Sequence, residues 1–360
     1  MNQRERFLNW MNFQPVDRAP LMEMGFWDET FLRWHSEGLP KWVTHDRHIE
    51  SYLGLDISYN RNWLPINTLL YPAPETRVIQ ETENEQIVVD DRLVTLRQQK
   101  QFKSIPQYIR FPVSDEASYE AILPLLDGSA RGRYAEDFDT DLHWRWERGE
   151  IVGINFHSFF GFLRDFMGME TTCLAFYDQP KLVRRMIADR LAFARQVLAR
   201  VLATGKLVFF QVWEDMAYKA GPLISPRLVR EFMLPAYIEL VRFLREGGVK
   251  LIMVDCDGRV DSLLPIWLEA GIDGVYPCEI AAGSDPLALR RKFPAVRLMG
   301  GLDKRQFAEG KVGAAAELAR IAPLLREGAF IPFVDHFVPP DVSYETYCFS
   351  VEERRKNLQG

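Results

Sequence analysis

The fold is decided by the stretch VKLIMVDCDGRVDSLLPIWLEAGIDGVYPCE at residues 249–279. It opens with the apolar run Val249–Val254, passes through a helical segment at 259–270 and returns to a second apolar run, Ile272–Tyr276. Short apolar runs are typical of strands buried on both faces, and a helix between two of them is the crossover that parallel strands need. The stretch therefore predicts one βαβ unit of a parallel sheet.

The same alternation continues on both sides of this unit, so that at least six βα units lie between residues 151 and 360. A further buried strand is expected at Ala19–Phe26 and one more before residue 151. Eight units predict an α/β fold of the (β/α)8 TIM barrel type. An open doubly wound sheet is the alternative, but no Gly-x-Gly-x-x-Gly follows the first expected strand. The other runs expected as strands are Ile151–Asn155, Leu207–Val212, Val296–Met299 and Phe330–Val334.

The region of about residues 66–112 has a different pattern, because it is rich in β-forming residues and holds no βα repeat. Val78–Gln80 and Gln86–Arg97 flank a polar turn, which predicts a small antiparallel hairpin. We expect this accessory hairpin to be an insertion in the N-terminal part of a single barrel domain that spans residues 1–360.

Composition excludes several classes of protein. The net charge is −6 and no basic run occurs, which argues against nucleic acid or a membrane surface as the partner. The four cysteines form no CxxC pair, the first six residues are highly charged, and no window of 18 residues is apolar throughout. We therefore expect a soluble cytoplasmic protein. The nine Trp and 24 Phe residues indicate either a large core or an aromatic-lined pocket for a flat ligand.

Nearly every expected strand is followed by a carboxylate, an imidazole or a thiol. In a barrel these positions meet at one rim, where the active site lies. Crowded carboxylates repel one another unless they are protonated, paired or metal-bound, so the rim predicts a functional site. We expect Asp255, Asp257 and His336 to be catalytic. The expected substrate-binding residues are Glu23, Trp27, Asn155, His157, Glu214, Cys278, Glu279 and Asp303.

Several of these residues also have a purely structural interpretation. Asp257 could cap the next helix while Gly258 makes a tight turn, and Glu214 could lie at a helix N-terminus. Cys278 could be a small buried hydrophobic residue, and His336 or His157 a buried histidine whose hydrogen bonds are satisfied. Both interpretations remain open from the sequence.

Seven stretches of the chain occur in the same order as in a known superfamily. They are Arg4–Leu8, Pro15–Pro20, Phe162–Glu170, Gly221–Pro226, Asp257–Val260, Met299–Asp303 and Asp335–Ser343. Together they resemble the uroporphyrinogen decarboxylase-like superfamily, and this resemblance implies a (β/α)8 barrel. True uroporphyrinogen decarboxylases look different near the first strand, where their arginines hold an acidic tetrapyrrole. Here the stretch Met22–Asp28 has no arginine and carries two acids, which does not suit a polyacidic substrate.

The chain is more similar to the branch of the superfamily that contains corrinoid-dependent methyltransferases. The resemblance implies methyl transfer between a substrate or tetrahydrofolate and a cobalamin (corrinoid) carried by a partner protein. The zinc-dependent members resemble one another in a His-x-Cys motif after one strand and a Cys after the last strand. The positions of this motif match Asp255 and Asp257 here, and the position of the last Cys matches His336. These harder ligands suit zinc with mixed N/O ligands or another divalent metal.

Two other functions remain as alternatives. One is a decarboxylase or lyase that acts on a smaller substrate through carboxyl groups and His336 as general acids. The other is a protein that binds a ligand or a corrinoid partner without turnover. The expected partners are a small-molecule methyl donor or acceptor and a corrinoid protein, and a homodimer is one possible oligomeric state.

Overall fold

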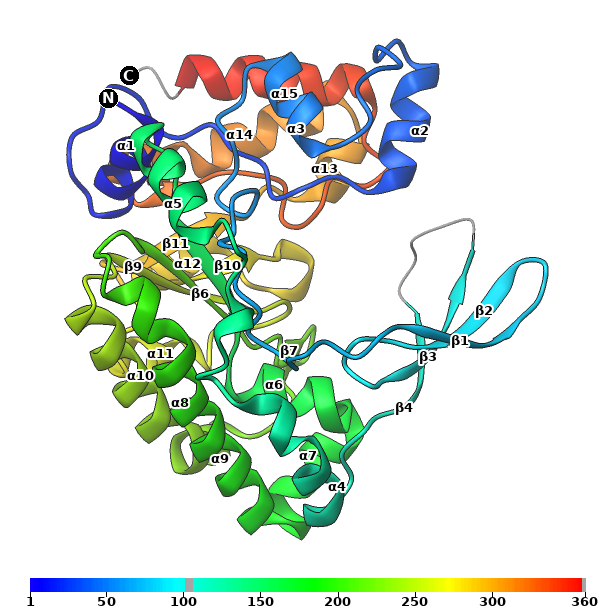
Figure 1. Cartoon of the computed structure of the whole chain (residues 1–360). Coiled ribbons are helices and arrows are strands. Elements are labelled where there is room, and N and C mark those ends of the chain that lie inside the picture. Colours follow the sequence, from blue (N-terminus) through cyan, green and yellow to red (C-terminus); the bar gives the residue numbers. More distant parts are fainter. Residues whose placement is uncertain (101–105, 358–360) are drawn as a thin grey trace.

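The computed structural model describes residues 1–100 and 106–357 and centres on a parallel β-sheet (Figure 1). Six strands lie in the order β12-β11-β10-β9-β6-β5, and every neighbouring pair is parallel. Each strand overlaps one of the runs predicted between residues 151 and 334, which confirms that part of the prediction. The strands are β5 (Gly153–His157), β6 (Phe209–Trp213), β9 (Leu251–Asp255), β10 (Gly274–Cys278), β11 (Arg297–Gly300) and β12 (Phe330–Ile331).

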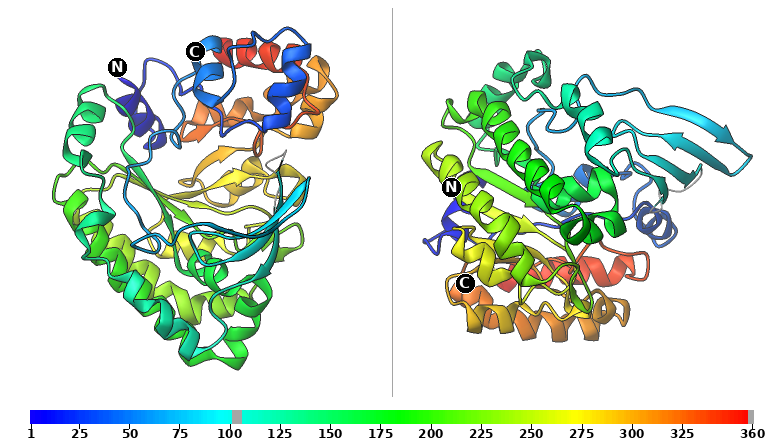
Figure 2. Two further views of the ribbon diagram at one scale, coloured as in Figure 1. Left: turned by 45° about the vertical axis from the view of Figure 1, so that its right-hand side comes forward. Right: turned by 90° about the horizontal axis from the view of Figure 1, so that it is seen from below.

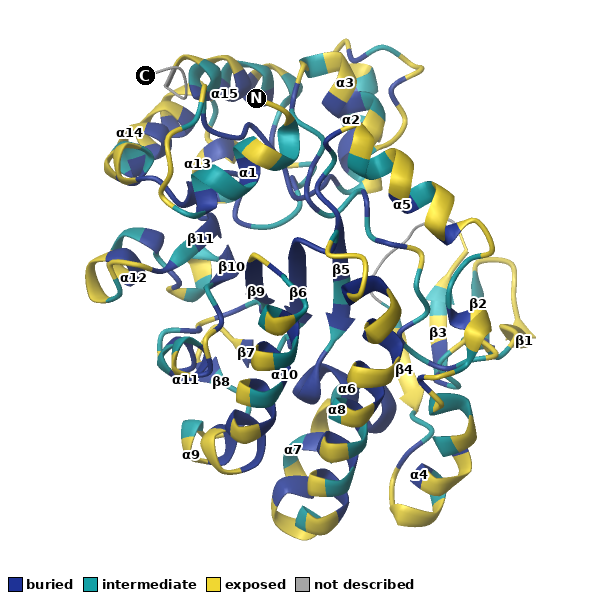
Figure 3. Ribbon diagram, turned by 60° about the vertical axis from the view of Figure 1, so that its left-hand side comes forward, coloured by how far each residue is buried: buried dark blue, intermediate teal, exposed yellow. Residues whose placement is uncertain are grey.

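Helices connect these strands and turn their apolar sides toward the sheet, so that the strands are largely buried (Figure 3). Side chains cap two of the helix starts: Ser225 Oγ accepts a hydrogen bond from Leu228 N, and Asp285 Oδ1 accepts one from Leu287 N. The connecting elements are α6 (Phe159–Met167), α7 (Met169–Asp178), α8 (Pro180–Leu202), β7 (Ala217–Tyr218), β8 (Gly221–Pro222), α9 (Pro226–Leu228), η3 (Val229–Met233), α10 (Leu234–Glu246), α11 (Leu264–Glu269), η4 (Ile280–Ala282), α12 (Pro286–Lys292), α13 (Lys304–Ala308), α14 (Lys311–Glu327) and α15 (Tyr344–Asn357).

The N-terminal part differs from the prediction. Ala19–Phe26 is extended and buried, but it forms no regular strand and joins its neighbour through one parallel bridge, Phe26 to Val338. At the other edge of the sheet, Trp63 makes a single parallel bridge to Gly153. Among the described residues the parallel sheet thus has six strands instead of the eight expected. The remaining helical elements are α1 (Gln3–Met11), α2 (Asp28–Ser36), α3 (Asp46–Leu53), α4 (Glu116–Ile122), η1 (Leu123–Leu126), η2 (Arg131–Arg133) and α5 (Phe138–Glu147).

The apolar core is divided into two clusters by the sheet. Side chains alternate along a strand, so Phe210, Ile252 and Leu298 face the covering helices while their neighbours face the opposite side. Helix α1 packs against this inner side, with the rings of Phe7 and Phe209 5.6 Å apart. The inner cluster consists of Phe7, Met11, Met22, Met24, Tyr59, Ile151, Phe209, Leu251, Met253, Tyr276, Met299, Ile331 and Phe333.

A second, antiparallel sheet projects from the body, as Figures 1 and 2 show. The expected hairpin is in fact this four-stranded accessory sheet, in the order β1-β2-β3-β4. The predicted run Val78–Gln80 lies in β1, whereas the predicted run Gln86–Arg97 is divided between β2 and β3. The prediction missed β4, which is solvent-exposed along its whole length and shows no apolar alternation. The strands are β1 (Arg77–Glu81), β2 (Glu85–Val89), β3 (Thr95–Gln99) and β4 (Gln107–Arg110).

Within the part of the chain that the structure describes, no helix is both long enough and apolar enough to cross a membrane.

Candidate active site

Two cavities lie beyond the carboxyl ends of β5, β6, β9 and β10, and they share Arg164 and Met169. The first, which we call the acidic pocket, has a volume of about 570 Å³. The second, which we call the aromatic pocket, has a volume of about 400 Å³. Both volumes are within the usual range of small-molecule sites. The acidic pocket is lined by Arg164, Met169, Asp215, Ala217, Tyr218, Lys219, Leu223, Asp257, Gly258, Glu279, Ala281 and Ala282. The aromatic pocket is lined by Arg92, Tyr108, Phe111, His157, Arg164, Asp165, Met169, Glu170 and Trp213.

Two cations partly balance the carboxylates of the acidic pocket. Arg164 Nη1 forms an ion pair with Asp215, and Lys304 Nζ lies 3.5 Å from Glu279 Oε1. Lys304 Nζ is also 3.6 Å from Oδ1 of the buried Asp335. Asp257 has neither cation within ion-pair distance.

Asp257 lines this pocket and lies next to His336, with Asp257 Oδ2 3.7 Å from His336 Nε2. Burial raises the pKa of Asp257 to about 8, and the nearby charges of Asp215 and Glu279 act in the same direction. Burial lowers the pKa of His336, as does the charge of Lys304. At neutral pH the pair therefore consists of a carboxylic acid and a neutral imidazole. Trp27 stacks beside His336, with ring centroids 6.0 Å apart.

Asp255 belongs to a different network, deeper in the sheet. Its Oδ2 accepts a hydrogen bond of 2.6 Å from Gln211 Nε2, and the Tyr276 hydroxyl donates to Gln211 Oε1. Burial, together with the charges of Asp257 and Asp215, raises the pKa of Asp255 well above its ordinary value. Asp255 is therefore a neutral acid held by Gln211.

The predicted metal ligands do not form a metal site. In residues 1–100 and 106–357, no group of three His, Cys, Asp or Glu side chains is placed to hold a metal ion. His336 and Asp257 are close together, but Asp255 is bonded to Gln211 instead. Because zinc sites have three or four protein ligands, this donor set does not fit the implied zinc.

The backbone around the acidic pocket is unusual at two positions. Asp215 has φ = +43°, a left-handed conformation that is uncommon for a residue with a side chain. Gly258 has φ = +83°, and a Cβ at this position would lie 2.6 Å from the backbone of Tyr218. Glycine is therefore required directly after Asp257, where the chain passes close to the β7–β8 hairpin.

The fold is similar to that of a methyltransferase from Methanosarcina mazei. The TM-score is 0.63, the sequence identity is 13%, and the similarity covers 99% of each chain. At this identity the likeness concerns the fold, including its parallel sheet. No protein-family model matches the sequence, and no curated protein matches it either.

Glu23, expected at the substrate, instead lies in the interior of the fold. Its Oε2 accepts a hydrogen bond of 3.0 Å from the Tyr347 hydroxyl and pairs with Arg354 at 3.3 Å, while Oε1 accepts from Val334 N. Burial raises its pKa to about 7 in spite of the charge of Arg354. Because the side chain is fully buried and its oxygens are engaged, it joins the first extended segment to α15 and does not reach a pocket.

Three more of the expected substrate-binding residues have structural roles. Glu214 is buried and accepts hydrogen bonds from Phe159 N and Gly161 N, so it caps α6. Asp303 caps α13 by accepting from the backbone N–H of Arg305. Cys278 is fully buried, and burial raises the pKa of its thiol to about 12. None of the three lines either pocket.

The remaining expected residues are at or near the pockets. Glu279 lines the acidic pocket and accepts a hydrogen bond of 2.7 Å from Gly258 N. His157 lines the aromatic pocket, and its Nδ1 is 2.5 Å from Asp165 Oδ2. Asn155 lies two residues before His157 on β5, and its buried Oδ1 has no hydrogen-bond partner among the described residues.

Sequence reasoning did not select Arg164, Asp165, Gln211 and Lys304. A signal existed for the first two, because they belong to the stretch Phe162–Glu170 that carries part of the family resemblance. Gln211 is hidden inside an apolar strand, where its neighbours gave no reason to expect a polar contact. Lys304 is one residue beyond Asp303, at the start of a helix that was not predicted.

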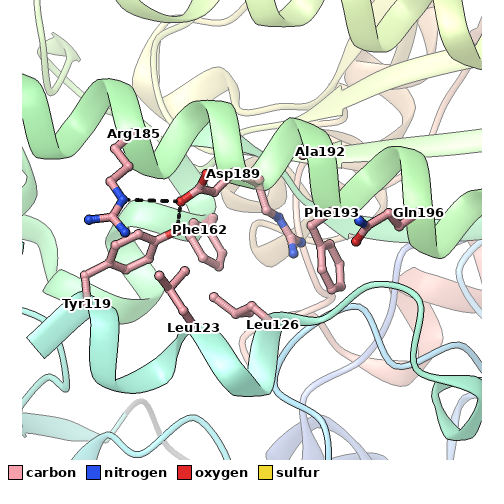
Figure 4. Close-up of a pocket in the computed structure, with 10 residues that line it drawn as sticks. Tyr119, Leu123, Leu126, Phe162, Arg185, Asp189, Ala192, Phe193 and Gln196 are labelled. Atoms are coloured by element: carbon pink, nitrogen blue, oxygen red, sulfur yellow. Dashed lines mark hydrogen bonds and ion pairs between the residues drawn. The ribbon is translucent and has the colours of Figure 1, made fainter.

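A third cavity, of about 290 Å³, lies away from the strand ends, between α4, η1 and α8 (Figure 4). Tyr119 and Arg185 both contact Asp189 there. None of the residues predicted as site residues lines this cavity, so we assign it no part in the active site.

Proposed function

We propose that the six parallel strands belong to a (β/α)8 barrel that is completed by Ala19–Phe26 and the segment around Trp63. Two parallel bridges support this proposal: Trp63 pairs with Gly153 of the edge strand β5, and Phe26 pairs with Val338, which follows the other edge strand β12 along the chain. Met22, Met24 and Tyr59 also pack in the inner cluster with the strand residues, as the interior of a barrel requires. The full-length likeness to a methyltransferase fold supports the same architecture.

We further propose that the chain is a methyltransferase that takes a methyl group from a small-molecule donor at the acidic pocket. The observation that carries this proposal is Asp257, a carboxyl group that remains protonated near neutral pH beside His336. When a methyl group leaves an oxygen or nitrogen, the bonding electron pair stays on that atom. A positioned acid that protonates this atom accelerates the step, typically by about 10²–10⁴-fold.

In this reaction Asp257 gives its proton to the leaving atom, and the C–O or C–N bond breaks as the acceptor takes the methyl group. Lys304 offsets the negative charge of Glu279, so the pocket tolerates the Asp257 carboxylate formed in the step. His336, which is neutral, can take part in returning the proton. A corrinoid carried by a partner protein would supply the methyl acceptor, approaching where Tyr218 and Lys219 are exposed.

The test incubates the purified chain with cob(I)alamin and one methyl donor at a time: a methoxyarene, a methylated amine, methanol or methyltetrahydrofolate. Formation of methylcobalamin, followed by its absorbance spectrum, is the expected result with at least one donor class. An unchanged spectrum with every donor would overturn the proposal. Release of carbon dioxide from a carboxylated substrate without cobalamin would replace it by the decarboxylase alternative, since a neutral Asp257 could also protonate a carbanion.

A further inference from the structure

The aromatic pocket is assembled from two distant parts of the chain. His157 and Trp213 come from the ends of β5 and β6, and Arg164, Asp165 and Met169 from α6 and α7. The opposite wall belongs to the accessory sheet and the residues that follow it. Val113 N donates a hydrogen bond of 2.9 Å to Phe166 O, which fixes the end of the accessory segment against α6.

His157 is held in place from several sides. Its Nδ1 bonds to Asp165, and its carbonyl oxygen accepts two hydrogen bonds, of 2.9 and 2.6 Å, from the buried guanidinium of Arg190. The ring centroid of Trp213 lies 4.3 Å from that of the imidazole. With Nδ1 engaged, Nε2 is the ring nitrogen left for a ligand, and within the described chain it makes no hydrogen bond.

Asp165 is fixed in turn by the accessory sheet. Arg92 Nη1 lies 2.9 Å from Asp165 Oδ1, and Arg92 is itself anchored by Asp90, whose Oδ2 accepts hydrogen bonds from Nε and Nη2. Burial acts to raise the pKa of Asp165, but the hydrogen bond with His157 and the charges of His157, Arg92 and Arg164 outweigh it, so the pKa is lowered. A carboxylate on one imidazole nitrogen fixes the tautomer and orientation of the ring, as in other acid–base sites.

The rest of this pocket suits a flat ring with an acidic substituent. Tyr108 and Phe111 stack on each other with centroids 5.6 Å apart, and both line the pocket together with Trp213. The guanidinium of Arg164 is 5.3 Å from the Trp213 ring centroid. Among the described residues, all hydrogen bonds of the Arg164 side chain leave from Nη1, so Nε and Nη2 are available to an anion. Guanidinium groups favour planar carboxylates.

We propose that this pocket binds an aromatic acid, whose ring lies against Trp213, Tyr108 and Phe111 and whose carboxylate meets Arg164, with the imidazole of His157 beside the ligand. Asp165 and Arg92 are positioning residues for His157, so the accessory sheet completes the binding site. The inference deepens the proposed function, because Arg164 is shared by both pockets and an aromatic acid bound here can direct a methylated substituent toward Asp257. The binding itself does not depend on methyl transfer.

The test measures binding to the full chain by calorimetry, with 4-methoxybenzoate and, as the matched saturated control, trans-4-methoxycyclohexanecarboxylate. We expect the aromatic acid to bind at least tenfold more tightly than the control. Equal affinities would overturn the aromatic assignment, and no binding of either acid would overturn the site. Binding without methyl transfer would leave this inference standing and remove the proposed function. Methyl transfer from aliphatic donors without binding of an aromatic acid would support the proposed function and overturn this inference.

Two variants test the positioning residues. Asp165→Asn should weaken binding of 4-methoxybenzoate about tenfold and remove the far-downfield imidazole N–H proton resonance that a histidine bonded to a carboxylate gives. Arg92→Gln should weaken binding, whereas Arg92→Lys, which keeps the charge, should restore most of it. Loss of the resonance without a change in affinity, or equal affinities for the Gln and Lys variants, would contradict the roles of Asp165 and Arg92.

Discussion

Asp165 and Asp257 are two carboxyl groups at the same end of the sheet, each beside a histidine, yet their pKa values shift in opposite directions. Asp165 is the more buried, with 5% of its side chain exposed against 40% for Asp257. Burial alone would therefore make Asp165 the more easily protonated of the two. Instead its pKa is lowered, while that of Asp257 is raised.

The difference comes from the partners within reach of each group. Asp165 has Arg92 at 2.9 Å and His157 at 2.5 Å, and both favour its charged form. Asp257 has His336 only at 3.7 Å, and the charges of Asp215 and Glu279 oppose its ionisation. One pocket thus contains a fixed anion that orients a histidine, and the other contains an acid that can give up a proton. Such a separation of pKa values is a general way to assign acid and base roles.

The largest expected effect comes from removing the acid. Asp257→Asn keeps the shape of the side chain but has no proton to donate, so we expect kcat/KM for methyl transfer to fall by about 10²-fold or more. In the wild type the activity should decline as the pH rises past neutrality, because Asp257 ionises. Asp261→Asn, at an exposed ion pair with Arg259, is the matched control and should leave kcat/KM unchanged. Full activity of the Asp257 variant would exclude it as the acid.

The second-largest expected effect is on the free energy of unfolding, when Asp165 loses a neighbouring cation and its surroundings become more like those of Asp257. Arg92→Gln removes the cation from a buried carboxylate, and we expect a loss of about 1–3 kcal/mol in the free energy of unfolding at pH 7. Because the folded-state pKa of Asp165 is lowered, its stabilisation is present above the ordinary pKa of 3.8 and is lost as the pH falls through the folded-state value. The difference between variant and wild type should therefore be full at pH 7 and smaller at pH 3, which lies below the ordinary pKa.

Urea unfolding at both pH values measures this difference. Arg200→Gln breaks the exposed pair with Asp139 and serves as the control, with an expected change within about 0.5 kcal/mol. Equal losses for the two arginine variants would mean that Arg92 does not stabilise the Asp165 carboxylate.

The smallest effect is on the stability of the Asp257 variant. The folded-state pKa of Asp257 is raised, so its contribution to stability is fully present below the ordinary pKa of 3.8 and is lost as the pH rises through the folded-state value. Asparagine has no charge to bury, so Asp257→Asn should gain in Tm relative to the wild type between pH 5 and pH 9. We expect a gain on the order of 1 °C, since the group is partly exposed. Thermal unfolding at several pH values that shows no trend would indicate an ordinary pKa.

Much of the parallel sheet could be predicted, because Leu207–Val212 and Val249–Val254 are largely apolar runs of strand length, and each is followed by a helical segment. The strand at Ala19–Phe26 was predicted for the same reason, yet the segment is buried without a regular ladder. The apolar content of a segment indicates that the segment is buried. Whether it forms a regular strand depends on which segments lie beside it in the fold and can pair with its backbone. The exposed strand β4 was missed for the opposite reason, since its pairing leaves no apolar pattern.

The residues of the candidate site also divide into those that the sequence could identify and those that it could not. Asp257, Glu279 and His157 could be found because each follows or ends a strand, and strand ends meet at one edge of a parallel sheet. Three other acids have equivalent positions in the sequence but form structural interactions instead. Glu23 pairs with Arg354, Glu214 accepts hydrogen bonds at the α6 N-terminus, and Asp303 caps the α13 N-terminus.

The sequence by itself determined that reactive side chains would gather at the strand ends, because the period of burial along the chain sets where strands begin and end. Only the tertiary structure decided which of those side chains face a pocket and in which protonation state. Arg354 lies 331 residues from Glu23, and Arg92 lies 73 residues from Asp165. Electrostatic energies depend on distances in space, which the sequence order does not contain.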